Sequence, residues 1–145
     1  MSPIAGYGLF AVKTIPPNYF LMEYTGKRIQ KIPYNQSYVA KLGNVYVNAK
    51  HSDGNHKYVN HCCEPNSKFI KWADKNSIER LSIVSQETIR KGSEITVHYG
   101  SEFMIEKCNC FKCNPGITPV ATIQTRSASK SKCTVYGNDI SIDNQ

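Results

Sequence analysis

Apolar residues occur along this chain in short runs that turn residues separate, and nowhere do they recur every three or four positions over the length of a helix. At residues 44–49 (NVYVNA), two valines and an alanine alternate with tyrosine and asparagine, which is the two-residue period of a strand. Strand-like runs also occupy residues 18–24, 27–34, 68–72, 80–85 and 94–99. The pattern therefore predicts a mainly β domain of short strands.

Turn-forming residues separate these strands. Pro16 and Pro17 introduce the run at residues 18–24, whose apolar side chains predict a buried strand. The polar segment 73–79 lies between two strand-like runs, so we expect a hairpin there. We also expect turns at residues 52–56 and 89–92, and one helical turn at residues 37–42.

The chain has 145 residues, the size of one domain. Residues 117–145 are rich in Ser, Thr, Asn, Lys and Gln, so we predict a disordered tail. No run approaches the roughly 18 apolar residues that cross a membrane. The N-terminus lacks a basic segment followed by a long apolar one, so no signal peptide is expected. These features predict a soluble, intracellular protein.

The formal net charge of +7 allows two interpretations. It can attract nucleic acid, or a protein bound to it. It can equally serve solubility, because no long run of Lys and Arg occurs. The densest basic group comprises Lys68, Lys71, Lys75, Arg80, Arg90 and Lys91.

Three of the six cysteines lie within six residues, at Cys108, Cys110 and Cys113. Neighbouring cysteines in a C-x-C pair bridge poorly to each other, so this spacing favours a metal site over disulfides. The alternative is a set of reduced thiols in a reducing compartment.

The segment from Gly6 to Ala11 fits G-x-G-x-x-A, a pattern of dinucleotide-binding folds. That fold needs a strand before the glycines and a helix after them. Only five residues precede Gly6, and Pro16 and Pro17 follow too early for the helix. Two interpretations remain: a tight turn with positive φ, or a glycine loop whose backbone approaches a cofactor.

Three segments together resemble the SET-domain family of protein-lysine methyltransferases. They are GYGLFAVKTIPPNYFLMEYTG (6–26), DGNHKYVNHCCEPN (53–66) and GSEITVHYG (92–100), in the family's order. The cluster Cys108-x-Cys110-x2-Cys113 is similar to the post-SET cysteine segment that follows the domain in many members. The resemblance covers roughly Gly6 to Gly116, and places a SET domain at residues 1–104 and a post-SET-like cluster at 105–116.

The resemblance implies a SET fold of small sheets with a threaded, pseudoknotted C-terminal segment. It also implies an S-adenosyl-L-methionine-dependent protein-lysine N-methyltransferase, with Tyr99 as the catalytic residue. Tyr24 and Tyr46 are weaker candidates for the walls of a lysine channel. The residues expected to bind the methyl donor are Gly6, Tyr7, Gly8, Tyr58, Asn60, His61 and Tyr99.

The resemblance further implies a zinc site formed by Cys63 with Cys108, Cys110 and Cys113, which would hold the C-terminal segment over the peptide channel. Four thiolates are a common structural zinc site. Cys62 and Cys133 remain without a role. The expected partner is a protein with a lysine-bearing tail, taken to be a histone, and a weak electrostatic contact with nucleic acid or the nucleosome is expected. The nucleus or chromosome is the expected location, with the cytoplasm as the alternative.

Several positions depart from the family pattern. The cysteine spacing is C-x-C-x2-C instead of C-x-C-x4-C, and the shorter form resembles methyltransferases acting on the tail of histone H4. His98 stands where an aspartate is usual, and Val97 where an aromatic residue often influences the number of methyl groups added. The degree of methylation and the substrate lysine are therefore open. The alternatives are a catalytically weak SET-like module that binds peptides, and a zinc-knuckle protein that binds nucleic acid.

Overall fold

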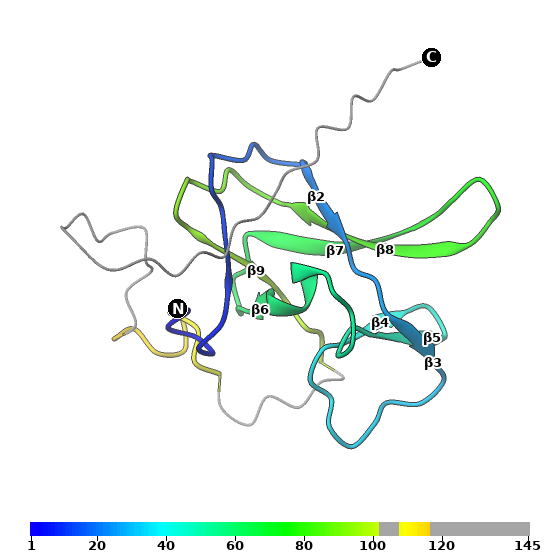
Figure 1. The fold of residues 1–145 in the computed structure, drawn as a ribbon. Helices are drawn as coiled ribbons and strands as arrows, with labels where there is room; N and C mark the ends of the chain where they lie inside the picture. The colour runs from blue at the N-terminus through cyan, green and yellow to red at the C-terminus, as the bar shows by residue number, and fades with distance from the viewer. Residues whose placement is uncertain (102–107, 117–145) are drawn as a thin grey trace, which may run out of the picture.

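The computed structural model describes residues 1–101 and 108–116. Over these residues the chain forms three small sheets of three strands each (Figure 1). The elements are β1 (Leu9–Phe10), β2 (Phe20–Glu23), β3 (Lys27–Ile29), β4 (Val39–Leu42), β5 (Val45–Asn48), the 3-10 helix η1 (Asn55–Tyr58), β6 (Asn60–His61), β7 (Ser67–Ala73), β8 (Glu79–Ser85) and β9 (Glu94–Val97). The predicted mainly β fold is confirmed.

The largest sheet has the order β2-β8-β7, and the predicted hairpin forms its long arm (Figure 1). Asp74 closes the hairpin turn by accepting hydrogen bonds from the backbone N–H groups of Asn76 and Ile78. The prediction of a fully buried strand at residues 18–24 is wrong at Phe20, which is 46% exposed. Phe20 lies at the sheet edge opposite Val84, and the neighbouring Ile83 takes the core position.

The second sheet has the order β3-β5-β4. The helical turn expected at residues 37–42 is wrong, because Val39–Leu42 is a strand that pairs antiparallel with β5. This pairing buries Ala40 and Leu42 in the core, which outweighs local helix preference. Gly43 and Asn44 between two apolar runs form the two-residue connection, with Gly43 at φ +59°. That dipeptide is a hairpin signal.

The third sheet places β9 between β1 and β6, antiparallel to the first and parallel to the second. The C-terminal strand thus lies among segments from earlier in the chain, as a threaded C-terminal segment requires. Strands β1 and β6 are two residues long each, too short for a periodic pattern to predict them. Because β1 follows the glycines and pairs antiparallel with β9, the Rossmann interpretation is excluded.

One hydrophobic core joins all three sheets, with Leu9, Leu42, Ile83 and Val97 among its buried residues. Among the described residues, no helix has the length and apolar character to cross a membrane. The predicted tail at 117–145, Cys133, and the boundary predicted between residues 104 and 105 lie outside the described residues.

Candidate functional site

A cavity of about 420 Å³ lies where the N-terminal segment, the segment leading into β4, the end of η1 and the residues after β9 meet. Its walls include aromatic rings from each of these regions. Four of the residues predicted for the donor site line it: Tyr7, Tyr58, Asn60 and Tyr99. The fold therefore brings together residues that are up to 92 positions apart in the sequence.

Tyr7 and Tyr58 line this cavity from two segments that lie far apart in the sequence. Their ring centroids lie 6.0 Å apart with the planes tilted by 40°. The Nζ atom of Lys57 lies 5.4 Å from the Tyr58 ring centroid, close enough for a cation–π contact. Tyr7 is largely exposed, so its ring is available to a flat ligand.

Asn60 lies on β6 and is 8% exposed. Its side-chain Nδ2 donates to the carbonyl oxygen of Tyr7 at 2.7 Å and to Glu94 Oε1 at 2.7 Å, and it lies 3.2 Å from the Ser2 hydroxyl. These bonds join three distant parts of the chain behind the cavity wall. Glu94 was not predicted as a site residue.

His61 lies beside the cavity and does not line it. Its Nδ1 accepts a hydrogen bond from the backbone N–H of Tyr99 at 3.1 Å, which requires that nitrogen to be unprotonated. Burial and the neighbouring His98 lower the pKa of His61, in agreement with a neutral ring. The imidazole therefore fixes the backbone of Tyr99 at the end of β9.

The hydroxyl of Tyr99 donates a hydrogen bond to the carbonyl oxygen of Val59 at 2.9 Å. Burial raises the pKa of Tyr99 to about 12, so the phenol stays protonated well above neutral pH. Burial also raises the pKa of Tyr24, another cavity residue that the sequence analysis proposed as a channel wall. Tyr46 was proposed with it but does not line the cavity.

Tyr38 is a cavity residue that sequence reasoning missed. Its electrostatic influence raises the pKa of both Tyr24 and Tyr99, after the larger effect of burial. Its backbone has φ +63°, a conformation that costs a bulky residue about 1–3 kcal/mol. No periodicity or motif distinguished Tyr38 from the other eight tyrosines in the sequence.

The two predicted glycines do not line the cavity. Gly6 has φ +76°, which confirms the interpretation of a tight turn that needs a positive φ. A Cβ atom on Gly8 would lie 2.3 Å from Glu94 Oε1 and 2.7 Å from Ser2 Cβ. Gly8 is therefore required by the packing of Glu94.

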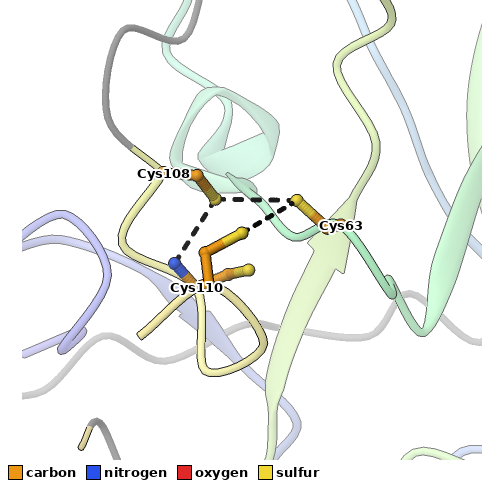
Figure 2. Close-up of side chains that lie close together, drawn as sticks. Cys63, Cys108 and Cys110 are labelled. Atoms are coloured by element: carbon orange, nitrogen blue, oxygen red, sulfur yellow. Dashed lines mark hydrogen bonds between the residues drawn. The ribbon is translucent and has the colours of Figure 1, made fainter. Parts of the chain in front are cut away.

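Four cysteines form a cluster that could hold a metal ion. Cys63 comes from the loop after β6 and lies close to Cys108 and Cys110 (Figure 2), and Cys113 is the fourth member of the cluster. Their sulfur atoms all lie within 4.8 Å of one another, with 3.8 Å from Cys63 to Cys108 and 3.5 Å from Cys63 to Cys113. A tetrahedron with metal–sulfur bonds of about 2.3 Å has sulfur–sulfur edges of about 3.8 Å. The four side chains therefore fit such an ion.

The thiols of this cluster differ in pKa. A hydrogen bond with Cys113, together with burial, raises the pKa of Cys63 to about 12. Burial opposes ionisation of Cys110 as well, but backbone N–H groups of Cys63 and Cys113 lower its pKa to about 6. Negative charges on neighbouring thiolates repel one another, and a bound cation is what lets several of them ionise together.

Cys62 adjoins Cys63 and lies close to Cys110, but it is not one of the four clustered thiols. Its side chain is fully buried and donates to the backbone carbonyl of Glu64 at 3.2 Å. Burial, with smaller effects of the cluster thiols, raises the pKa of Cys62 to about 12. It is therefore a neutral structural thiol.

Two members of the basic group noted in the sequence form ion pairs. Lys71 pairs with Glu79 at 2.8 Å. Arg80 pairs with Asp74 at 2.9 Å and with Glu23 at 3.3 Å. The group therefore offers less free positive charge than its composition indicates.

Comparisons with known proteins agree on one family. The family model described as SET domain matches residues 6–100. The chain is 32% identical over 121 residues to a histone-lysine N-methyltransferase, H3 lysine-36 specific, of Saccharomyces cerevisiae, covering 72% of this chain and 16% of that protein. It is 28% identical over 127 residues to histone-lysine N-methyltransferases Set2 of Drosophila melanogaster and SETD2 of Homo sapiens, covering 75% of this chain and 5% of each. The chain thus spans a small fraction of these relatives.

Proposed function

The chain belongs to the SET-domain family, and from this membership we propose that it is an S-adenosylmethionine-dependent protein-lysine N-methyltransferase acting on a histone. The cavity in which Tyr7, Tyr58, Asn60 and Tyr99 meet carries the proposal. Relatives named as H3 lysine-36-specific enzymes support histone H3 as the first substrate to test. We propose nuclear residence on the same basis.

The residues around the cavity suit a reaction that depends on alignment. S-adenosylmethionine supplies, when bound, an electrophilic methyl group on a sulfonium. An attacking lysine must be neutral, and removing its proton at neutral pH costs roughly 4–5 kcal/mol from its reference pKa. The rings of Tyr24, Tyr38 and Tyr99 limit water around the amine, which lowers this cost. The Tyr99 oxygen, whose proton is directed to Val59, can direct its lone pairs to the amine.

We propose that the ion held by Cys63, Cys108, Cys110 and Cys113 is zinc, because four thiolates in a tetrahedron are typical of structural zinc. The ion would tie residues 108–116 to the loop after β6. Lys112 also forms an ion pair with Glu64 between these two segments.

A direct assay tests the proposed activity. We expect the purified full chain to bind S-adenosylmethionine in calorimetry and to transfer a radiolabelled methyl group to histone H3 or, as the cysteine spacing suggested, H4. Transfer to the histones must disappear when the tail lysines are replaced by arginine. Binding of histone tails without cofactor binding or label would instead support the peptide-binding module.

We propose that the sheet β3-β5-β4 and its loops contact nucleosomal DNA. Residues 27–57 contain six Lys or Arg and one Asp, a net charge of +5 out of the total +7. Lys27, Lys31 and Lys50 are exposed, and none has an ion pair among the described residues. Tyr34, within the same segment, is fully exposed. Residues 36–41 also line the cavity, so DNA bound here would lie beside the substrate entrance.

Reversing three of these charges should weaken nucleosome methylation. The triple variant Lys27→Glu, Lys31→Glu, Lys50→Glu is expected to lose at least tenfold in kcat/KM on nucleosomes and less than threefold on a free histone peptide. A plot of the logarithm of the duplex DNA binding constant against the logarithm of the salt concentration should become shallower by about 3 units of slope. Each lost phosphate contact accounts for roughly 0.9 of this change. A matched triple variant at Lys68, Lys75 and Lys91 changes charge equally. Equal losses in both variants would exclude a localised DNA contact.

A further inference from the structure

The orientation of the Asn60 amide is dictated by its neighbours. Two of the three groups around Nδ2, the Tyr7 carbonyl and the Glu94 carboxylate, lie 2.7 Å away and are hydrogen-bond acceptors. The amide nitrogen has two hydrogens, and these two short bonds use both. A flipped amide would bring oxygen against oxygen at both positions, so Nδ2 must face inward.

The other atom of the amide, Oδ1, then faces the opposite way. Asn60 lines the cavity, and Oδ1 has no hydrogen bond to any described residue. Within the described part of the chain, every buried side-chain nitrogen or oxygen has a partner, so Oδ1 reaches the open space of the cavity. There it presents an acceptor to a ligand that carries N–H donors.

Glu94 is an unusual group to find at this position. Both of its oxygens are occupied, one by Asn60 and the other by the Ser2 hydroxyl at 2.9 Å. No Lys or Arg in the described ranges forms an ion pair with it. Burial raises the pKa of Glu94, and the hydrogen bonds from Asn60 and Ser2, followed by the positive charge of the N-terminal amino group, oppose this change. The two hydrogen bonds therefore hold the carboxylate in place and fix it against the Asn60 amide.

We propose that Glu94 is the positioning residue of the methyl-donor site. It holds the Asn60 amide with Oδ1 toward the cavity, where Oδ1 accepts a hydrogen bond from the α-ammonium group of S-adenosylmethionine. This inference rests on the proposed function, because it takes the cavity as the donor site. Glu94 acts through Asn60 and does not itself contact the ligand.

Gly8 supports the assignment independently of the hydrogen bonds. The Glu94 carboxylate occupies the space that a side chain at Gly8 would take, with Oε1 2.3 Å and Cδ 2.9 Å from the position of an added Cβ. The second glycine of the G-x-G pattern therefore leaves room for the carboxylate that orients Asn60.

Affinity for S-adenosylmethionine, measured by calorimetry on the full chain, tests the inference in a double-mutant cycle. We expect Glu94→Ala to raise the Kd at least tenfold and Asn60→Ala to raise it at least as much. The double variant should be no worse than Asn60→Ala alone, because Glu94 acts only through Asn60. For a saturating histone peptide, the KM for S-adenosylmethionine should rise with the Kd while kcat changes less than threefold.

Conservative variants separate positioning from charge and from folding. Glu94→Gln keeps an acceptor for Asn60 and is expected to bind within threefold of the wild type. Glu94→Asp keeps the charge but is too short to reach Asn60, and should resemble Glu94→Ala.

Four outcomes would overturn the inference. If the losses of binding free energy in the two single variants added up in the double variant, Glu94 would act independently of Asn60. A loss in Glu94→Gln as large as in Glu94→Ala would assign the effect to charge, and normal binding by Glu94→Asp would do the same. A wild-type protein that does not bind S-adenosylmethionine would overturn the proposed function, and the inference with it.

Discussion

Replacing Tyr99 by phenylalanine is expected to lower kcat for methyl transfer about 100-fold, while the Kd for S-adenosylmethionine changes less than threefold. A 100-fold loss corresponds to about 2.7 kcal/mol of transition-state stabilisation, typical of removing one oriented polar group at a reacting centre. The hydroxyl is oriented by its bond to the Val59 carbonyl, and the variant removes this oxygen while it keeps the ring. Single-turnover transfer to a histone H3 peptide measures the effect.

Tyr46→Phe is the matched control, because Tyr46 lies on β5 and does not line the cavity. It should keep full activity. Equal activity of Tyr99→Phe and the wild type would show that Tyr99 has no role in the chemical step, whereas equal losses in both variants would point to a general effect on folding.

The pKa of Tyr99 gives a second readout of the same variant. Burial raises this pKa to about 12, so the protonated phenol is the favoured form at all pH values below about 12. The rate between pH 7 and pH 10 should therefore follow the lysine substrate, which loses its proton as pH rises toward its reference pKa near 10.4. Wild type and Tyr99→Phe should show parallel pH profiles. If the rate rose with pH only in the wild type, the phenolate of Tyr99 would be acting as a base.

Short motifs predicted much of this site because each motif residue can be identified from its immediate neighbours in the sequence, although the motifs themselves lie far apart. The segment from Tyr58 to Asn66 placed Asn60 at the cavity and Cys63 in the metal cluster. The same reasoning ended the last strand at Tyr99, whereas β9 ends at Val97 and Tyr99 lies two residues beyond it, where it lines the cavity.

Residues that act through distant contacts could not be predicted in this way. Glu94 meets Asn60 only because β9 lies between β1 and β6, and no local pattern in the sequence contains that pairing. Tyr38 reaches the cavity from a backbone conformation that L-residues rarely adopt. The helical turn expected around it was wrong because pairing with β5 decides the conformation of residues 39–42. Tertiary contacts thus determine the positions of these residues, which local secondary-structure propensity does not predict.

Replacing Cys63 by serine is expected to reduce bound zinc from about one ion per chain to less than about 0.1. Cys63 is the one thiol of the cluster that comes from the SET domain body, with sulfurs of Cys108 and Cys113 at 3.8 and 3.5 Å. Structural zinc sites contribute on the order of 10 kcal/mol apparent, far more than one surface ion pair such as Lys112–Glu64 can replace. Without the ion, residues 108–116 should detach from the loop after β6.

The adjacent cysteine provides the control for this last prediction. Cys62→Ser keeps a donor for the Glu64 carbonyl and removes none of the four clustered thiols, so its zinc content should equal that of the wild type. Elemental analysis measures the stoichiometry, and limited trypsin digestion after Lys112 measures detachment, which should be at least tenfold faster in Cys63→Ser. If residues 108–116 cover the peptide channel, kcat/KM for a histone peptide must fall in step with zinc loss. Full zinc occupancy in Cys63→Ser would exclude Cys63 as a ligand, and full activity in a zinc-free variant would show that residues 108–116 do not need to be held over the channel.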